Sequence, residues 1–372
     1  MEFLMLASFG EIIKYAIYII LAILVLLVMI TVHEFGHYIT GKIFGFGIEE
    51  FSIGFGPKLY QKQKKDGELF SVRLLPIGGF CAFKGEDKDD DDPSAFNNKK
   101  PWQRIIVLIS GALMNFLFAL LLIILQFSVY GQTSLVAYNV EENPVYSSYS
   151  FCDKDVILKA DGKNIYMITD LMTALDGKKE GDIVEFKVIR ERKTQDVQVM
   201  LRANTDFSAV DDSKTLYSAL GIEYNINENG ELVNGGIYST WVRFGFFQTI
   251  GRSFEYSLRI GASVFIVLKQ LVTGALGIGA LGGTVTTITM TANAIDMGGF
   301  KYLINIASLI GVNLAVFNLL PIPALDGSRV VFTAIEWIRK KPISRRTEGI
   351  IHGVGLVLLL CFAVFIDIQQ CF

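Results

Sequence analysis

Cysteine and histidine are scarce in this chain of 372 residues, which has four cysteines and three histidines. The cysteines, at positions 81, 152, 361 and 371, have no short paired spacing, so the sequence suggests neither a thiolate zinc site nor a disulfide scaffold. We interpret them as packing residues. The formal net charge is only -3, and no basic patch carries interleaved aromatic residues, so we expect no nucleic acid among the partners.

Charged residues are nearly absent from four long stretches of the chain. The sequence is 51% hydrophobic and its mean hydropathy is +0.43, which is too apolar for an ordinary soluble protein. A helix of about 20 residues crosses a hydrocarbon core of about 30 Å. We therefore predict a polytopic membrane protein with about four spanning helices, at 15–40, 105–130, 301–326 and 349–366. The first is too long for a cleavable signal peptide.

Lysine and arginine gather in two of the loops between these spans. They run from Lys42 to Arg104 between the first two spans, and from Arg329 to Arg346 between the last two. Loops rich in these residues stay on the cytoplasmic side of a membrane. We therefore expect both loops to be cytoplasmic, and both termini and the large middle segment to lie outside.

Two of the three histidines fall in one motif, His33-Glu34-Phe35-Gly36-His37, at the end of the first predicted span. On a helix, histidines four residues apart lie on one face and can bind one metal ion, with the glutamate beside it. The alternative is a set of polar residues that meets the lipid headgroups. Three ionisable residues within five positions of a membrane helix favour a functional site, and this spacing is typical of zinc proteases.

A catalytic zinc usually has three protein ligands, so a third is required. The remaining candidates are His352, a carboxylate or a cysteine. We favour Asp326, which follows Pro321 and Pro323 at the end of the third predicted span. The prolines break the helix there and direct the carboxylate away from a regular helical surface. The alternative for Asp326 is a simple turn residue, and we interpret His352 as a packing residue.

The first cytoplasmic loop carries two alternating apolar segments, 50–60 and 69–83, separated by a polar turn at 62–67. This pattern predicts a β-hairpin. Such strands beside a membrane could offer an exposed edge to an extended peptide near Gly78 and Gly79. An ordinary hairpin that packs on the helices fits the pattern equally well.

Beyond the second span, residues 133–202 have the pattern of a soluble α+β module. Their order of turns, strands and one helix resembles a PDZ domain of the bacterial membrane-protease type, with Val145 and Lys154 as departures. A PDZ domain binds chain ends by strand addition or acts as a size filter. Farther on, 244–269 has the spacing of an interfacial amphipathic helix, and 274–291 is rich in glycine and threonine and could be a re-entrant or flexible element.

These motifs together resemble the site-2 protease family of intramembrane zinc metalloproteases, in its bacterial sigma-factor-regulating branch. The resemblance rests on His33 to His37, on Asn318-Leu-Leu-Pro-Ile-Pro-Ala-Leu-Asp326-Gly327 and on the PDZ-like module between them. Segments 54–57 and 76–80, and Gly111 with Asn115, also resemble family positions. Departures are the single divergent PDZ module and the segment 282–284, where relatives often carry a Gly-Pro element.

The resemblance implies one catalytic Zn²⁺ held by His33, His37 and Asp326, with Glu34 as the general base. Asn318 would correspond to the family's substrate-orienting or oxyanion-assisting asparagine. The glycines Gly78 and Gly79 of the hairpin would hold an unwound stretch of substrate. The implied location is the bacterial cytoplasmic membrane, with the active site toward the cytoplasm and the PDZ-like module outside.

The predicted fold is therefore a bundle of about four transmembrane helices with a membrane-associated β-hairpin and one extracytoplasmic α+β PDZ-like domain. In chain order, we expect a first transmembrane helix with the zinc motif (1–42), a cytoplasmic hairpin loop (43–103), a second transmembrane helix (104–131), the PDZ-like domain (132–203), a connecting region with an amphipathic helix (204–300), a third transmembrane helix with the aspartate motif (301–327), a cytoplasmic loop (328–348), and a fourth transmembrane helix with a tail (349–372).

Three functions fit these expectations. The first is regulated intramembrane proteolysis of single-span membrane proteins, such as an anti-sigma factor or a remnant signal peptide, after an upstream site-1-type protease has trimmed the substrate. The second is a membrane-anchored zinc protease for protein quality control, which would call for a glutamate ligand on a downstream helix. The third is a catalytically dead PDZ scaffold, which the presence of Glu34 and all three metal-binding residues opposes.

Overall fold

The computed structural model describes residues 9–86, 90–140, 149–207, 213–226, 232–233, 235–274, 277, 282–341 and 343–371. The chain forms two compact units. The first consists of Met1–Gln126 and Phe246–Phe372, and the second of Phe127–Gly245. Each unit is described by itself below.

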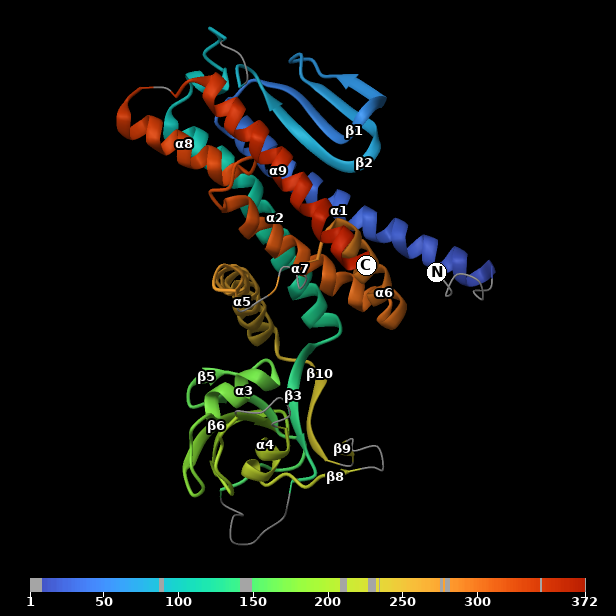
Figure 1. Cartoon of the computed structure of the whole chain (residues 1–372), viewed down its shortest axis with the longest axis vertical. Coiled ribbons are helices and arrows are strands. Elements are labelled where there is room, and N and C mark those ends of the chain that lie inside the picture. The colour runs from blue at the N-terminus through green and yellow to red at the C-terminus, as the bar shows by residue number, and fades with distance from the viewer. Residues whose placement is uncertain are drawn as a thin grey trace. The chain divides into compact units, whose positions relative to one another are not determined.

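Four helices among the described residues are long and apolar enough to cross a membrane, as the hydropathy predicts. They are α1 (Phe9–Ile43), α2 (Pro101–Val129), α7 (Phe300–Leu319) and α9 (Arg345–Cys371), and all belong mainly to the first unit (Figure 1). Their outward faces carry large apolar side chains such as Ile20, Leu121 and Leu358, which are more than half exposed. Lipid would cover such faces.

The third span is shorter than predicted, because the helix breaks before the aspartate. Helix α7 ends at Leu319, and Leu320 already has an extended backbone ahead of Pro321. Proline lacks the N–H that a helix needs and disfavours helical geometry in the residue before it. A separate helix, α8 (Asp326–Arg339), then begins at Asp326 and occupies most of the predicted loop 328–348. Asp326 therefore stands at the start of a new helix.

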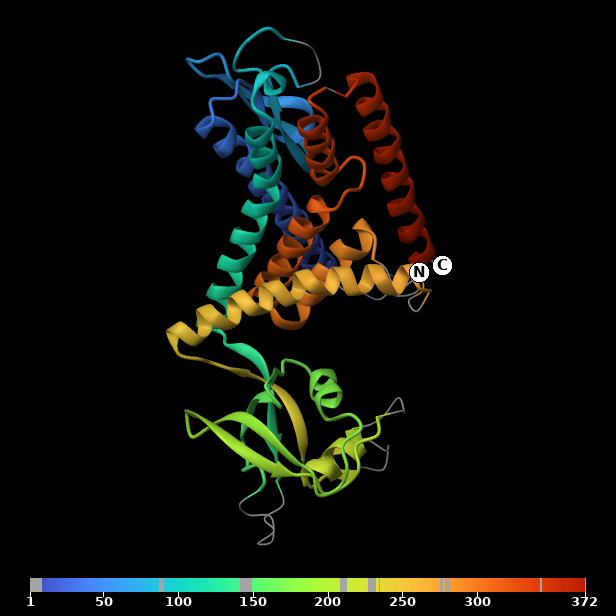
Figure 2. The same cartoon turned by 90° about the vertical axis from the view of Figure 1, so that its left-hand side faces the viewer.

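Two further helices complete the first unit. Helix α5 (Phe246–Val272) lies across the direction of α2 (Figure 2), with Ser253 and Ser257 buried and Phe247 and Phe265 exposed. Helix α6 (Thr284–Gly298) fills part of the glycine- and threonine-rich stretch that we expected to be re-entrant or flexible. The Asp367 carboxylate of α9 accepts hydrogen bonds from two amides in the first turn of α6. Carboxylates stabilise helix N-termini in this way.

The predicted hairpin forms, and it folds back on itself. Strand β1 (Ile48–Gln63) and strand β2 (Leu69–Phe83) pair directly across the turn from Lys58↔Arg73 to Gln63↔Leu69. The start of β1 then lies between the two ends of β2, because Phe51 is aligned with both Phe70 and Cys81. The segment 79–83 is consequently an outer strand of this small sheet.

The second unit is an α+β module built on one antiparallel sheet. Strands follow the order β10-β3-β4-β6-β7, with β5 paired to β4. Its core includes the fully buried Leu135, Ile157, Leu171 and Phe186. The elements are β3 (Gln132–Tyr138), β4 (Val156–Ala160), β5 (Lys163–Asn164), α3 (Ile168–Leu175), β6 (Ile183–Arg190), β7 (Lys193–Met200), α4 (Ser213–Leu220), β8 (Asn225–Ile226), β9 (Leu232–Val233) and β10 (Gly236–Val242).

This unit extends beyond the predicted range 132–203. Strand β10 pairs with β3 over seven residues, from Gln132↔Val242 to Tyr138↔Gly236, so the sheet includes a segment that we assigned to the connecting region. A pair of strands about a hundred residues apart has no local sequence signal, because the register depends on tertiary packing.

Candidate metal centre

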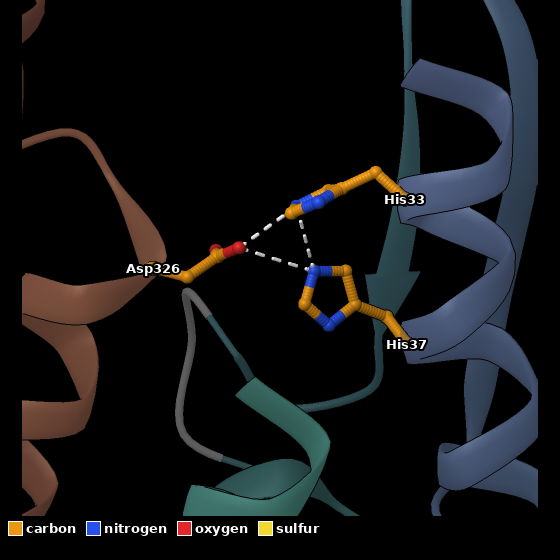
Figure 3. Close-up of side chains that lie close together, drawn as sticks. All are labelled: His33, His37 and Asp326. Atoms are coloured by element: carbon orange, nitrogen blue, oxygen red, sulfur yellow. Dashed lines mark hydrogen bonds and ion pairs between the residues drawn. The ribbon is translucent and has the colours of Figure 1, made fainter. Parts of the chain in front are cut away.

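Three side chains from two helices far apart in the sequence point at one another (Figure 3). His33 and His37 lie one turn apart on α1, and Asp326 is the first residue of α8. The Oδ2 atom of Asp326 is 2.8 Å from His33 Nε2 and 3.3 Å from His37 Nε2, and the two Nε2 atoms are 3.2 Å apart. Both histidines are only 7% exposed. The structure thus brings together the two histidines and the aspartate that the sequence predicted.

The other ring nitrogen of His37 fixes which nitrogen faces this cluster. His37 Nδ1 lies 2.8 Å from the carbonyl oxygen of Val107 on α2, so Nδ1 carries the proton and donates it to that oxygen. The Nε2 atom therefore keeps its lone pair. A metal-binding histidine is normally held in this tautomer by such a contact.

His33 has two amide side chains behind it. The Nδ2 atoms of Asn115 and Asn318 both lie 3.4 Å from His33 Nδ1, while Asn115 Oδ1 is buried without a hydrogen-bond partner. Turning the Asn115 amide over exchanges its oxygen and nitrogen. In that orientation Oδ1 accepts the His33 Nδ1 proton and no buried oxygen is left unpaired. His33 Nε2 then also presents a lone pair.

Two glycines allow α1 and α2 to approach closely at this point. A Cβ atom on Gly36 would lie 2.4 Å from the carbonyl oxygen of Ser110, and one on Gly111 would lie 2.4 Å from His37 Nε2. Any side chain at position 111 would therefore fill the space between the histidines. This close approach explains why the residue immediately before His37 is a glycine, Gly36.

The donor set fits zinc. Two imidazole nitrogens and one carboxylate oxygen are common zinc ligands, and bonds of about 2.0–2.1 Å in tetrahedral geometry place donor atoms roughly 3.3 Å apart. The observed separations of 2.8 to 3.3 Å are close to this spacing. Three donors leave the fourth position of a tetrahedral site open.

The nearby Cys81 thiol is not part of this donor cluster. Burial and the neighbouring Glu34 and Glu86 carboxylates raise the pKa of the Cys81 thiol well above its ordinary value. The cluster of donor atoms within 4.8 Å contains His33, His37 and Asp326.

Glu34 faces the outer strand of the hairpin. Its Oε2 atom accepts a hydrogen bond from the Cys81 backbone N–H at 3.0 Å. A Cβ on Gly79 would lie only 2.8 Å from the Ser52 carbonyl oxygen and 3.7 Å from Glu34 Cγ. Gly78 has φ +112°, and a Cβ there would overlap the Phe55 ring. Both predicted glycines are therefore positions where the sheet has no room for a side chain, and Gly79 is the one beside Glu34.

Several contacts of the site were not predicted from the sequence. The Val107 carbonyl carries no residue-type signal, because every residue has a carbonyl group. The position of Asn115 in the middle of an apolar span is itself a signal of function, but it does not reveal which residue Asn115 contacts. The backbone donor at Cys81 also has no signature in the sequence.

Comparison with known proteins agrees with this geometry. The model of peptidase family M50 matches residues 21–362. A Clostridium perfringens protein named "Putative zinc metalloprotease CPE1693" is 34% identical over 95% of this chain and 98% of its own length. A protein of Nostoc sp. with the same kind of name is 30% identical over 95% of each chain.

A solved PDZ domain, that of an SdrC-like protein from Listeria monocytogenes, matches 29% of this chain and 88% of its own. The TM-score of this match is 0.18 and the sequence identity is 16%. The family match covers most of the chain and includes every residue of the donor cluster. This membrane-embedded chain therefore belongs to peptidase family M50, the site-2 proteases, and is a zinc metalloprotease.

Proposed function

We propose that this protease hydrolyses peptide bonds within or next to the transmembrane segments of single-span membrane proteins. The observation that carries the proposal is the position of the donor cluster, because two of its three members, His33 and His37, lie on the apolar span α1 and are more than nine-tenths buried. A soluble substrate would have to enter the apolar part of the membrane to reach these residues. His33, His37 and Asp326 are the proposed zinc ligands.

Zinc, when bound, would polarise the scissile carbonyl and lower the pKa of water so that it attacks at neutral pH. Glu34 is the proposed general base, because its carboxylate is the acceptor next to the cluster. It would take the proton of the attacking water and pass it to the leaving amine. Asn318, whose amide lies 3.4 Å from His33, would donate a hydrogen bond to the developing oxyanion.

The hairpin supplies a place for the substrate backbone. A transmembrane helix bonds its carbonyls internally, so it must unwind before cleavage. In the outer strand 79–83, the Cys81 N–H points away from β1 and donates to Glu34, and the Phe83 N–H donates to the Glu86 carboxylate at 3.2 Å. We propose that an unwound segment pairs with this edge beside Gly78 and Gly79 and takes the place of the side-chain acceptors on its N–H groups.

A proline at position 81 tests this edge. Proline removes the N–H while the strand keeps its pairing to β1, because the lost donor faces outward. We expect Cys81→Pro to lower kcat/KM roughly tenfold, because it removes one hydrogen bond. The Cys81 N–H donates this bond to Glu34 and, in the proposal, to the backbone of a paired substrate strand. Zinc content should be unchanged. Cys81→Ala, which keeps the N–H, is the matched control, and equal activity of the two variants would contradict the role of the edge.

The second unit is proposed to regulate access. Its α+β sheet supports the interpretation as one PDZ-like module, which would admit stubs left by an upstream site-1-type protease. The lysine- and arginine-rich loops support an orientation in the bacterial cytoplasmic membrane with the donor cluster toward the cytoplasm and this module outside. Cleavage would then release a cytoplasmic fragment, as in regulated intramembrane proteolysis.

The position of the cut tests the function. Purified protein in detergent would be incubated with a single-span substrate, and mass spectrometry would locate the new termini. We expect the cut inside the apolar span or within a few residues of its cytoplasmic end. Cuts only in the soluble part would favour the quality-control protease, and no cleavage by zinc-loaded protein would favour a scaffold.

A further inference from the structure

The loop that precedes Asp326 is held mainly by hydrogen bonds within its own segment. Residues 320–325 connect α7 to α8 and include two prolines, which have no N–H. The N–H groups of Leu320, Ile322 and Leu325 all bond to carbonyls of the same segment, 317–322. The remaining N–H, that of Ala324, donates to the Nδ1 atom of His352 on α9 at 3.1 Å. Among residues 320–325, Ala324 is the one whose N–H donates to a side chain of another helix.

Ala324 also has an unusual backbone. Its φ of +77° lies in the left-handed region, where residues with a Cβ atom are uncommon. Such a conformation persists when surrounding contacts determine it. The His352 hydrogen bond is made by the N–H of this residue, two positions before Asp326.

Helix α9 packs closely against the same loop. The Gly355 backbone is so near Pro323 that a Cβ atom would lie 2.3 Å from Pro323 Cβ. The His352 ring itself packs on Phe332 of α8, with ring centres 5.6 Å apart at 66°. The imidazole thus packs against α8, while its Nδ1 atom accepts a hydrogen bond from the Ala324 N–H of the loop. Because Nδ1 accepts, the ring is the neutral tautomer with its proton on Nε2.

We propose that His352 is a positioning residue for the metal centre. Its imidazole fixes the left-handed Ala324 and thereby sets where the Asp326 carboxylate stands relative to His33 and His37. The proposal rests on the proposed ligand role of Asp326. It gives the third histidine of the chain, which the sequence suggested was a packing residue, a function that acts through one backbone N–H.

The test is the zinc dissociation constant of the full chain in detergent, measured by competition with a chromophoric chelator. Leucine and asparagine have nearly the same shape, and asparagine Oδ1 can take the place of His352 Nδ1 as acceptor. We expect His352→Leu to weaken zinc binding by about 10- to 100-fold, the usual cost of losing an outer contact to a ligand, and His352→Asn to stay within about threefold of wild type.

A second variant connects the effect to the backbone. Glycine adopts a positive φ without strain, so Ala324→Gly should recover a clear part of the lost affinity in the His352→Leu background while changing little alone. Gly353→Ala is the control for disturbing α9, because a Cβ atom there meets nothing within 4 Å. If His352→Leu does not fold, His352→Ala replaces it in the comparison with His352→Asn.

The outcomes separate this inference from the proposed function. Asp326→Asn should lose zinc most strongly. If Asp326→Asn binds zinc as wild type does, the ligand assignment fails and the role of His352 fails with it. If Asp326→Asn loses zinc but His352→Leu binds normally, or if His352→Asn is as damaging as His352→Leu, only the positioning role is overturned.

Discussion

Glu34→Gln should abolish hydrolysis while leaving the zinc in place. Glutamine keeps the shape of glutamate and an oxygen that can accept from the Cys81 N–H, but it cannot take a proton from water. Loss of a general base costs about 10²- to 10⁴-fold in rate. We expect kcat/KM on a single-span substrate to fall by that factor, with one zinc per chain in both proteins.

Glu11→Gln serves as the control, because Glu11 is an exposed carboxylate in the first turn of the same helix. Zinc is measured by atomic absorption on the samples used for the assay. Normal turnover by Glu34→Gln would refute the general-base role. Loss of zinc together with activity would instead place Glu34 among the groups that hold the metal.

Gly111→Ala should strongly weaken zinc binding. The added Cβ atom would lie 2.4 Å from His37 Nε2 and 2.8 Å from His33 Cε1, which is where an ion between the two rings would be. Real carbon atoms do not approach that closely, so the rings must turn away. We expect zinc affinity to fall by more than roughly 100-fold, beyond the cost of losing an outer contact, and activity to fall with it.

Gly251→Ala is the matched control, since a Cβ atom on this α5 glycine meets nothing within 4 Å. Thermal unfolding of the metal-free proteins would show whether Gly111→Ala still folds. A folded Gly111→Ala that binds one zinc with wild-type affinity would mean that the histidine Nε2 atoms do not share an ion on this side of α1.

The parts of the site that could be predicted are those with local signatures. The two histidines share one helix face because they are four residues apart, and Asp326 is marked by two prolines in an apolar stretch. The four spans follow from hydropathy. In each case the physical cause lies within a few residues of the feature.

The remaining features depend on contacts between distant segments. The hairpin folds back where Gly54 and Gly78 take positive φ, and glycine alone does not reveal which of its conformations is used. Strand β10 joins a sheet whose other strands come much earlier, and Val107 contributes only a carbonyl. The left-handed backbone of Ala324 also has no signal in the sequence, because alanine ordinarily favours a right-handed helix.

The distance between the donors along the chain has a consequence for biosynthesis. His33 and Asp326 are 293 residues apart, and the two histidines alone leave a zinc site one ligand short. During translation, α1 and α2 are made long before α8 leaves the ribosome. A nascent chain therefore lacks the third donor of the cluster until α8 has been made, so this centre can be completed only after both units of the chain have been translated up to Asp326.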